Sequence, residues 1–198
     1  MAETVLTTNE PHDYAGANHH YAEHVFPVRN PVAGSRSRCV VVTCSDPRCS
    51  PEHFFKLKEQ EATVIRNEGG RTADPAVIRT VVLLSLLMGS AGQAINEVLV
   101  VHHTDCVAYA FSNEELMEMI AKNDDAAPGG PFKAGALTWA EGLNFMGVPT
   151  GGSEYERLVR CVKQDVKFLR SHPLLKPSIH ISGWIYDIKT RHAEKIES

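Results

Sequence analysis

Four short apolar runs along the chain predict the strands of a buried sheet. They are rich in β-branched residues, are bounded by polar residues or glycine, and cover residues 39–43, 62–66, 97–101 and 178–186. Continuous apolar runs such as those at 39–43 and 97–101 are typical of strands covered on both faces, as in parallel sheets, whereas 178–186 alternates between apolar and polar positions. The polar segment 190–198 is expected to add either an edge strand or a short helix.

Apolar positions at helical spacing separate these runs. They predict helices over residues 17–26, 51–58, 75–89 and 112–122, and one that begins after Ser153. Ser153 and Glu156 have the spacing of a capping box, and Ser50 followed by Pro51 is a typical helix start. The segment 75–89 is apolar on nearly all sides, so it should be buried against the sheet or in a subunit interface.

The alternation of strands and helices predicts an α/β fold. We expect a central, mostly parallel sheet of about four strands flanked by helices. The 198 residues are enough for a single domain over 1–198, in which residues 1–15 form a flexible N-terminal segment. The proline- and glycine-rich stretch 124–135 is expected to be a loop within that domain.

Charge and cysteine usage exclude several classes of function. The net charge of -4 gives no basis for binding nucleic acid or an anionic membrane, and no apolar run is long enough to span a bilayer. The N-terminal residues lack the basic and apolar regions of a secretory signal. Five cysteines without regular spacing favour free thiols, and therefore a reducing compartment such as the cytoplasm.

Thiol, imidazole and charged side chains stand where two of the predicted strands end. Cys44, Asp46 and Arg48 follow the first strand, and His103 and Cys106 follow the third. In an open parallel sheet, binding sites form outside the carboxyl ends of the strands. Two thiolates and one imidazole are the ligands of a catalytic zinc site that leaves its fourth position to water.

Each of these residues also has an ordinary interpretation when it is taken alone. A single cysteine is more often a small buried residue, and a single histidine more often a hydrogen-bonded one. His103 is preferred to His102 because three residues separate it from Cys106 and because successive strand residues face opposite ways. His102 would then have a structural role, Asp105 would hydrogen-bond its own loop, and Cys49 has no partner at ligand spacing.

Asp46 has two possible roles beside a metal ion. It can bind the metal as a fourth protein ligand in a closed state. Alternatively, Arg48 can pair with it through two hydrogen bonds, which leaves Asp46 to accept a hydrogen bond from the metal-bound water. Arg48 is then the switch between the two states.

Two other groups of residues are weaker candidates. His19, His20 and His24 could form a metal cluster, but a solvated helix face is favoured because their spacing repeats no ligand pattern. Gly69 and Gly70 allow positive φ and close backbone approach, but they lack the spacing of either nucleotide-binding fingerprint.

Taken together, these motifs resemble those of the β-class carbonic anhydrases. The resemblance rests on the Cys44-x-Asp46-x-Arg48 and His103-x-x-Cys106 patterns. It extends through segments 64–70, 101–106, 165–170 and 183–187 and covers about residues 17–190. It implies a parallel-sheet α/β fold, a homodimer or dimer of dimers, and an Asp46–Arg48 catalytic pair. It also implies one Zn²⁺ per chain, bound by Cys44, His103 and Cys106.

The chain departs from the family pattern at two places. Pro47 stands where the family usually has serine or alanine, and Val107-Ala108 stands where it usually has two glycines. We expect the substrate pocket to be bordered by Gly69, Gly70, Val107 and Ala108.

The resemblance favours attack of metal-bound hydroxide on CO2 to give bicarbonate. The subgroup with the sequence HHTDC also includes enzymes that hydrolyse carbonyl sulfide or carbon disulfide, and a more apolar pocket would favour such substrates. Carbonyl sulfide hydrolysis to CO2 and hydrogen sulfide on the same site is therefore the alternative. A non-catalytic zinc or thiol protein is a further one.

Overall fold

The computed structural model describes residues 13–25, 37–58, 60–90, 95–124, 148–149 and 151–196. The chain divides into two units, residues 1–35 and 36–198. In the first unit, helix α1 (Tyr14–His20) is followed by the π-helical turn η1 (Tyr21–Val25). The helix begins three residues earlier than predicted because the Asp13 side chain accepts a hydrogen bond from the Gly16 N–H at 2.9 Å. The prediction of one domain over residues 1–198 stays a prediction.

His19, His20 and His24 are exposed on this helix and turn. His19 lies 3.2 Å from Glu23, and His20 stacks on His24 with ring centroids 4.6 Å apart. Within the part of the chain that the structure describes, the one group of three potential metal ligands lies elsewhere.

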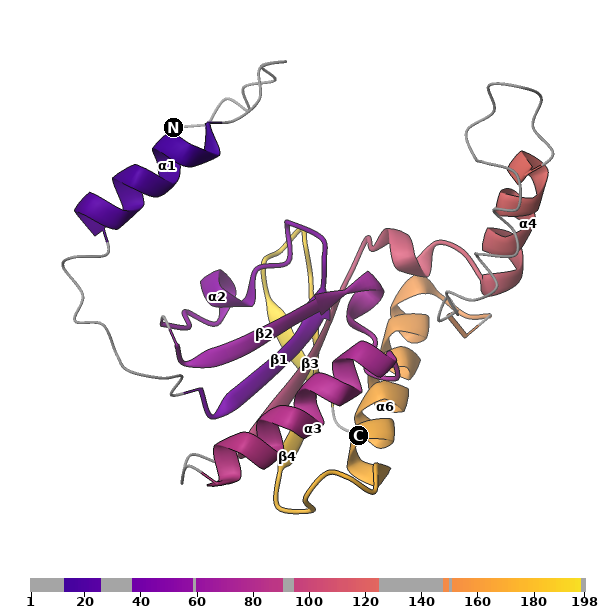
Figure 1. The fold of residues 1–198 in the computed structure, drawn as a ribbon. Coiled ribbons are helices and arrows are strands. Elements are labelled where there is room, and N and C mark those ends of the chain that lie inside the picture. Colours follow the sequence, from indigo (N-terminus) through magenta and orange to yellow (C-terminus); the bar gives the residue numbers. More distant parts are fainter. Residues whose placement is uncertain are drawn as a thin grey trace. The chain divides into compact units, whose positions relative to one another are not determined.

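The second unit contains a five-stranded sheet in the order β2-β1-β3-β4-β5 (Figure 1). Its strands are β1 (Cys39–Cys44), β2 (Ala62–Asn67), β3 (Glu97–His103), β4 (His180–Tyr186) and β5 (Ala193–Ile196). The first four pair in parallel, whereas β5 pairs antiparallel with β4 at the edge. The predicted parallel α/β sheet is confirmed, and the C-terminal segment adds a fifth strand.

Helices connect the strands close to where the sequence predicts them. They are α2 (Pro51–Phe54), α3 (Pro75–Ser90), α4 (Asn113–Asp124) and α6 (Glu154–Ser171), with 3-10 turns η3 (Glu68–Gly70) and η4 (Val107–Tyr109). The capping box of Ser153 and Glu156 starts α6. The prediction for α2 was wrong in length: Lys56 has a φ of 52°, which ends the helix early. The predicted loop 124–135 lies outside the described residues apart from Asp124.

Alternate residues of the central strands face two different cores. One core contains the buried side chains of α3 and α6, together with Val40, Val42, Val98 and Val100. The other contains Phe54 and Phe55, at the end of α2, together with Val41, Leu99 and Val101. This double burial explains why the strands are continuous apolar runs. Cys161 is fully buried in the first core, as the sequence predicts for a packed residue.

The register brings the carboxyl ends of the strands to one edge of the sheet. Cys44 pairs with Asn67, Thr43 with Val101, and His103 with Tyr186. The loops that follow β1, β2 and β3 therefore leave from the same edge, and these loops contain the residues singled out in the sequence. None of the described helices is both long and apolar enough to cross a membrane.

Candidate metal centre

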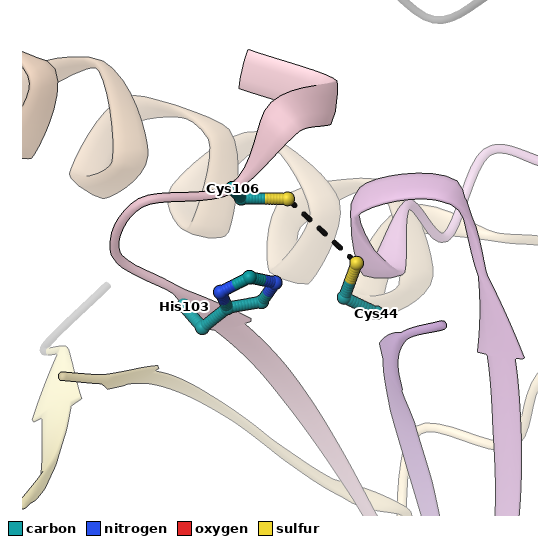
Figure 2. A group of neighbouring side chains, drawn as sticks. All are labelled: Cys44, His103 and Cys106. Atoms are coloured by element: carbon teal, nitrogen blue, oxygen red, sulfur yellow. Dashed lines mark hydrogen bonds between the residues drawn. The ribbon is translucent and has the colours of Figure 1, made fainter. Parts of the chain in front are cut away.

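Three potential metal ligands meet at this edge. Cys44 is the last residue of β1, His103 is the last residue of β3, and Cys106 directly precedes η4. One ligand atom of each lies within 4.8 Å of the other two, and all three residues are buried. Figure 2 shows the three side chains pointing toward one another, with the two sulfur atoms 3.7 Å apart.

The spacing of the sulfur atoms fits a tetrahedral metal site. Two thiolates bound to zinc at about 2.3 Å and a tetrahedral angle have sulfur atoms about 3.8 Å apart, far more than the length of a disulfide bond. The 3.7 Å between the Cys44 and Cys106 sulfurs matches that distance. The thiol pair is therefore arranged as for metal binding, and its cysteines are free.

The imidazole of His103 is oriented in the way that a metal ligand requires. Its Nδ1 lies 2.8 Å from the carbonyl oxygen of Thr104, which accepts the Nδ1–H. This contact places the free lone pair on Nε2, which is buried and has no hydrogen-bond partner among the described residues. The donor set of two sulfurs and one nitrogen therefore fits Zn²⁺.

Proton sharing between the two cysteines favours the thiolate form of Cys44 and the thiol form of Cys106. The hydrogen bond from the Cys106 thiol lowers the pKa of Cys44, and His103 adds to this effect. The pKa of Cys106 is raised, since its proton is shared with Cys44. Burial would lower the pKa of His103, but the contacts with Cys44 and Thr104 outweigh it and the pKa is raised. A divalent cation would replace these protons and pair with the thiolates.

Asp46 lies next to this cluster and is paired with Arg48. The Arg48 Nε lies 3.0 Å from Asp46 Oδ1, and Nη2 lies 2.7 Å from Asp46 Oδ2. These hydrogen bonds lower the pKa of Asp46 to about 2, so the carboxylate is charged at neutral pH. Asp46 Oδ2 is 4.0 Å from His103 Nε2. A negative charge therefore stands beside the candidate metal position, with Arg48 on its other side.

Asp105 forms a contact that the sequence did not predict. Its side chain accepts a hydrogen bond from Arg48 Nη1 at 2.7 Å, and its carbonyl accepts one from Arg48 Nη2 at 3.0 Å. The expectation that Asp105 bonds to its own loop was wrong, because the partner is 57 residues away. Spacing along the sequence does not predict a pair such as Arg48 and Asp105, whose members are 57 residues apart.

The four expected pocket residues fall in two places. Gly69 and Gly70 are buried in η3, with φ values of 68° and 71°. A Cβ on Gly70 would lie 3.0–3.1 Å from backbone atoms of Thr43 and Cys44, so Gly70 lets its loop lie against the end of β1. Ala108 lies against Gly69, whereas the Val107 side chain is 75% exposed.

A cavity of about 450 Å³ lies beside the cluster. Its lining includes Cys106, Val107 and both partners of the Arg48–Asp105 contact, with Glu154 and Arg157 from the start of α6. A small linear molecule fits easily into such a volume. Of the four expected pocket residues, Val107 is the one that lines this cavity.

A second polar cluster, centred on Asp165, was not identified from the sequence as functional. We call it the lower cluster, and the group of Cys44, His103 and Cys106 the upper cluster. Asp165 of α6 accepts a hydrogen bond from Arg71 Nε at 2.8 Å and another from the Thr72 hydroxyl at 3.0 Å, and lies 3.2 Å from His102 Nε2. The Tyr109 hydroxyl lies 2.7 Å from both His102 Nδ1 and the Gly69 carbonyl. The available signal was Asp165 itself, a carboxylate on the buried apolar face of α6.

Cys49 belongs to neither cluster. It is fully buried in the core on the α2 side, and its sulfur lies 3.1 Å from the Thr43 hydroxyl. Burial raises the pKa of its thiol to about 11. Cys49 therefore remains a protonated packing residue, in line with the absence of a partner at ligand spacing.

Comparison with known proteins identifies related chains over most of the length. The family model described as carbonic anhydrase matches residues 39–193. A carbon disulfide hydrolase of Acidianus sp. (strain A1-3) is 28% identical over 171 residues, which are 80% of this chain and 76% of that protein. β-Carbonic anhydrase 1 of Mycobacterium tuberculosis (strain ATCC 25618 / H37Rv) is 26% identical over 178 residues, which are 90% of this chain and 92% of that protein.

Solved structures show the same fold. A carbonic anhydrase from Glaciozyma antarctica aligns over 100% of both chains, with a TM-score of 0.72 and 25% identity. A carbonic anhydrase from Streptococcus mutans aligns with a TM-score of 0.65 and 26% identity, over 93% of this chain and 95% of that one.

Proposed function

The chain belongs to the β-carbonic anhydrase family, and we propose that it is a zinc enzyme that hydrates CO2 to bicarbonate. The observation that carries the proposal is the cluster of Cys44, His103 and Cys106, whose sulfur spacing and free Nε2 suit one Zn²⁺. Because these are three protein ligands rather than four, the site would keep one position for solvent. That position distinguishes a reactive zinc site from a structural one.

Each residue of the site has a distinct task in this proposal. Zinc, when bound, lowers the pKa of a water to about 7 and so supplies a hydroxide nucleophile near neutral pH. Asp46, charged because of Arg48, would accept a hydrogen bond from a water held there and would so orient it toward the substrate carbon. Arg48 keeps Asp46 off the metal. Addition of water to CO2 then gives bicarbonate and one proton.

The pocket also favours a second substrate, carbonyl sulfide, on the same site. Hydrolysis of COS by one water gives CO2 and hydrogen sulfide. The supporting observation is the exposed Val107 side chain on the cavity wall next to Cys106, which makes this part of the wall apolar. A weakly hydrated sulfur atom is accommodated there at a lower desolvation cost than a strongly hydrated oxygen. The similarity to a carbon disulfide hydrolase adds CS2 as a related substrate to test.

We further propose that the chain forms a homodimer or a dimer of dimers. The α3 helix is apolar on both sides: Val77 and Val81 are buried in the core, while Leu83 and Leu86 are 50% and 60% exposed. Two large apolar side chains on the outer face of one helix favour an interface with another subunit. The free thiol pair of the cluster favours a reducing compartment, and we propose the cytoplasm.

The proposal is tested by assaying purified, zinc-loaded protein with each gas in parallel. Stopped-flow acidification with CO2 and sulfide release from COS and CS2 are measured on the same preparation. Fast acidification without sulfide release supports the carbonic anhydrase. Sulfide release without CO2 hydration would contradict that function and support the carbonyl sulfide hydrolase instead.

An inactive protein with zinc bound would instead support the non-catalytic alternative. In an active protein, an Asp46→Ala variant with unchanged zinc content and unchanged turnover would contradict the role of the Asp46–Arg48 pair. In the proposed enzyme, Asp46→Ala retains zinc but loses most of the activity, because the water is no longer oriented.

A further inference from the structure

We propose that Asp105 is a positioning residue that keeps Arg48 on Asp46 and thereby keeps Asp46 off the metal. The inference rests on the proposed function, since it concerns the same site. It starts from the way in which Arg48 divides its hydrogen bonds between two carboxylates. On one edge of the guanidinium, Nε and Nη2 donate hydrogen bonds to the Asp46 carboxylate. On another edge, Nη1 donates to the Asp105 side chain and Nη2 to the Asp105 carbonyl.

The backbone determines which oxygen of Asp46 depends on Arg48. Asp46 Oδ1 also accepts the backbone N–H of Arg48 at 2.8 Å, in a tight turn that stays in place whatever the guanidinium does. Asp46 Oδ2 has the Arg48 guanidinium as its partner, and it is the atom 4.0 Å from His103 Nε2. If the guanidinium left, the freed oxygen would be the one beside the metal position, where it would bind a divalent cation.

Asp46 alone cannot fix the guanidinium, because Arg48 is 43% exposed and has a long flexible side chain. Asp105 supplies the second anchor, from a segment 57 residues away. With both anchors, the guanidinium is bound on two edges of its plane and its orientation is defined.

The conformation of Asp105 is itself stabilised from α6. Asp105 has a φ of 56°, which costs energy for most residues and which aspartate tolerates better than most. Its backbone N–H donates to Glu154 Oε1 at 2.9 Å. Glu154 therefore supports the loop in which the carbonyl and the carboxylate of Asp105 both face Arg48.

The decisive variant is Asp105→Gly, which keeps the positive φ and removes the carboxylate. Asp105→Asn keeps the shape and removes the charge, and Glu118→Gln is the matched control, an exposed carboxylate paired with Lys122. Two properties of the zinc-loaded full chain are measured: the kinetic constants, and the solvent protection of the Arg48 Nε–H by ¹⁵N NMR, assigned with Arg48→Lys.

We expect Asp105→Gly to bind one zinc per chain, to lose the protection of the Arg48 Nε–H, and to lower kcat about tenfold or more with little change in KM. Asp105→Asn should fall between Asp105→Gly and the wild type, and Glu118→Gln should match the wild type. Glu154→Gln, which keeps an acceptor oxygen, should retain more activity than Glu154→Ala.

Unchanged protection of the Arg48 Nε–H in Asp105→Gly overturns the proposal, as does an unchanged kcat. Loss of zinc with the Arg48 signal intact also overturns it, because Asp105 would then act on the metal ligands. Should the wild type hydrate or hydrolyse none of the gases, the proposed function fails by itself, and the Arg48 Nε–H measurement still decides whether Asp105 positions Arg48.

Discussion

Two adjacent histidines at the end of β3 belong to two different polar regions. His102 lies in the lower cluster, where its two ring nitrogens face Tyr109 and Asp165. His103 lies in the upper cluster, where Nδ1 faces a carbonyl and Nε2 is 4.0 Å from Asp46 Oδ2, whereas His102 Nε2 is 3.2 Å from Asp165 Oδ2. A ligand atom of His103 also lies within 4.8 Å of both the Cys44 and the Cys106 sulfur. Both side chains are fully buried. Burial therefore does not distinguish the two residues. The neighbouring groups do, since a carboxylate and a phenol surround His102, whereas two thiols lie beside His103.

In the lower region, charge pairs and hydrogen bonds are centred on the Asp165 carboxylate. The Asp165 carboxylate accepts hydrogen bonds from Arg71 and Thr72 and contacts His102. These contacts connect α6 to the segment after η3 and to β3. In the upper region, the Cys44 and Cys106 sulfur atoms lie 3.7 Å apart beside the His103 imidazole, and this donor set could hold a metal ion. We infer that the lower region fixes the positions from which the upper one binds metal.

The largest expected effect separates the two histidines directly. His103→Ala should lose zinc and at least about a thousandfold in turnover, since several kcal/mol of metal-derived stabilisation of the transition state disappear. His102→Ala should keep close to one zinc per folded chain while losing about 1–3 kcal/mol of unfolding free energy. Zinc analysis by mass spectrometry and urea titration measure both. Equal zinc loss in the two variants would contradict the division into two regions.

The next largest effect is expected when Asp165, the centre of the lower region, is changed. Asp165→Asn should lower the unfolding free energy by about 3–5 kcal/mol, because the charge of the buried carboxylate that pairs with Arg71 is removed. Urea denaturation checks this, with Glu118→Gln as the control, where an exposed pair contributes less than about 1 kcal/mol. A change for Asp165→Asn no larger than that of the control would mean that the buried pair does not anchor the loop.

A smaller effect concerns the η3 loop, which touches both regions. Gly70→Ala places a methyl group against the backbone at Cys44, whereas Gly151→Ala has a similar positive φ and open space around it. Both should be destabilised by the left-handed conformation, and Gly70→Ala should cost about 1–3 kcal/mol more. Only Gly70→Ala should also weaken zinc affinity, which a competitive chelator titration measures. Equal costs would show that the close approach at Gly70 is unimportant.

The smallest effect is the pH dependence of the lower region. Burial alone would raise the pKa of Asp165, but His102 and Arg71 outweigh it, and the pKa is lowered. The stabilisation is therefore complete above the unfolded pKa of about 3.9 and is lost as the pH falls below it. In urea titrations of chelator-treated protein, the difference between wild type and Asp165→Asn should shrink below about pH 4. A difference that grows on acidification would contradict this direction.

The sequence predicted the fold because its strands are covered on both faces. Val40–Val42 and Val98–Val101 pack against helices or aromatic residues on either side, and that burial requires continuous apolar runs. It also placed Cys44, His103 and Cys106 at one edge, since parallel strands end together. The sequence left the last strand open and predicted α2 too long. The end of α2 depends on a local conformation, the positive φ of Lys56, that apolar periodicity does not predict.

The contacts that the sequence did not predict all join residues far apart in the chain. Arg48 reaches Asp105 across 57 residues, and Arg71 reaches Asp165 across 94. Periodicity predicts which face of an element is apolar, but it does not pair single charges between elements. Asp165 nevertheless stands out afterwards, because a buried carboxylate needs a partner.

Zinc K-edge X-ray absorption on the purified wild type tests the central claim most directly. We predict two sulfur ligands at about 2.3 Å, one imidazole nitrogen at about 2.0–2.1 Å, and one further light atom that Asp46→Ala does not remove. An absorption spectrum without sulfur ligands, or a protein that binds no zinc, would contradict the account.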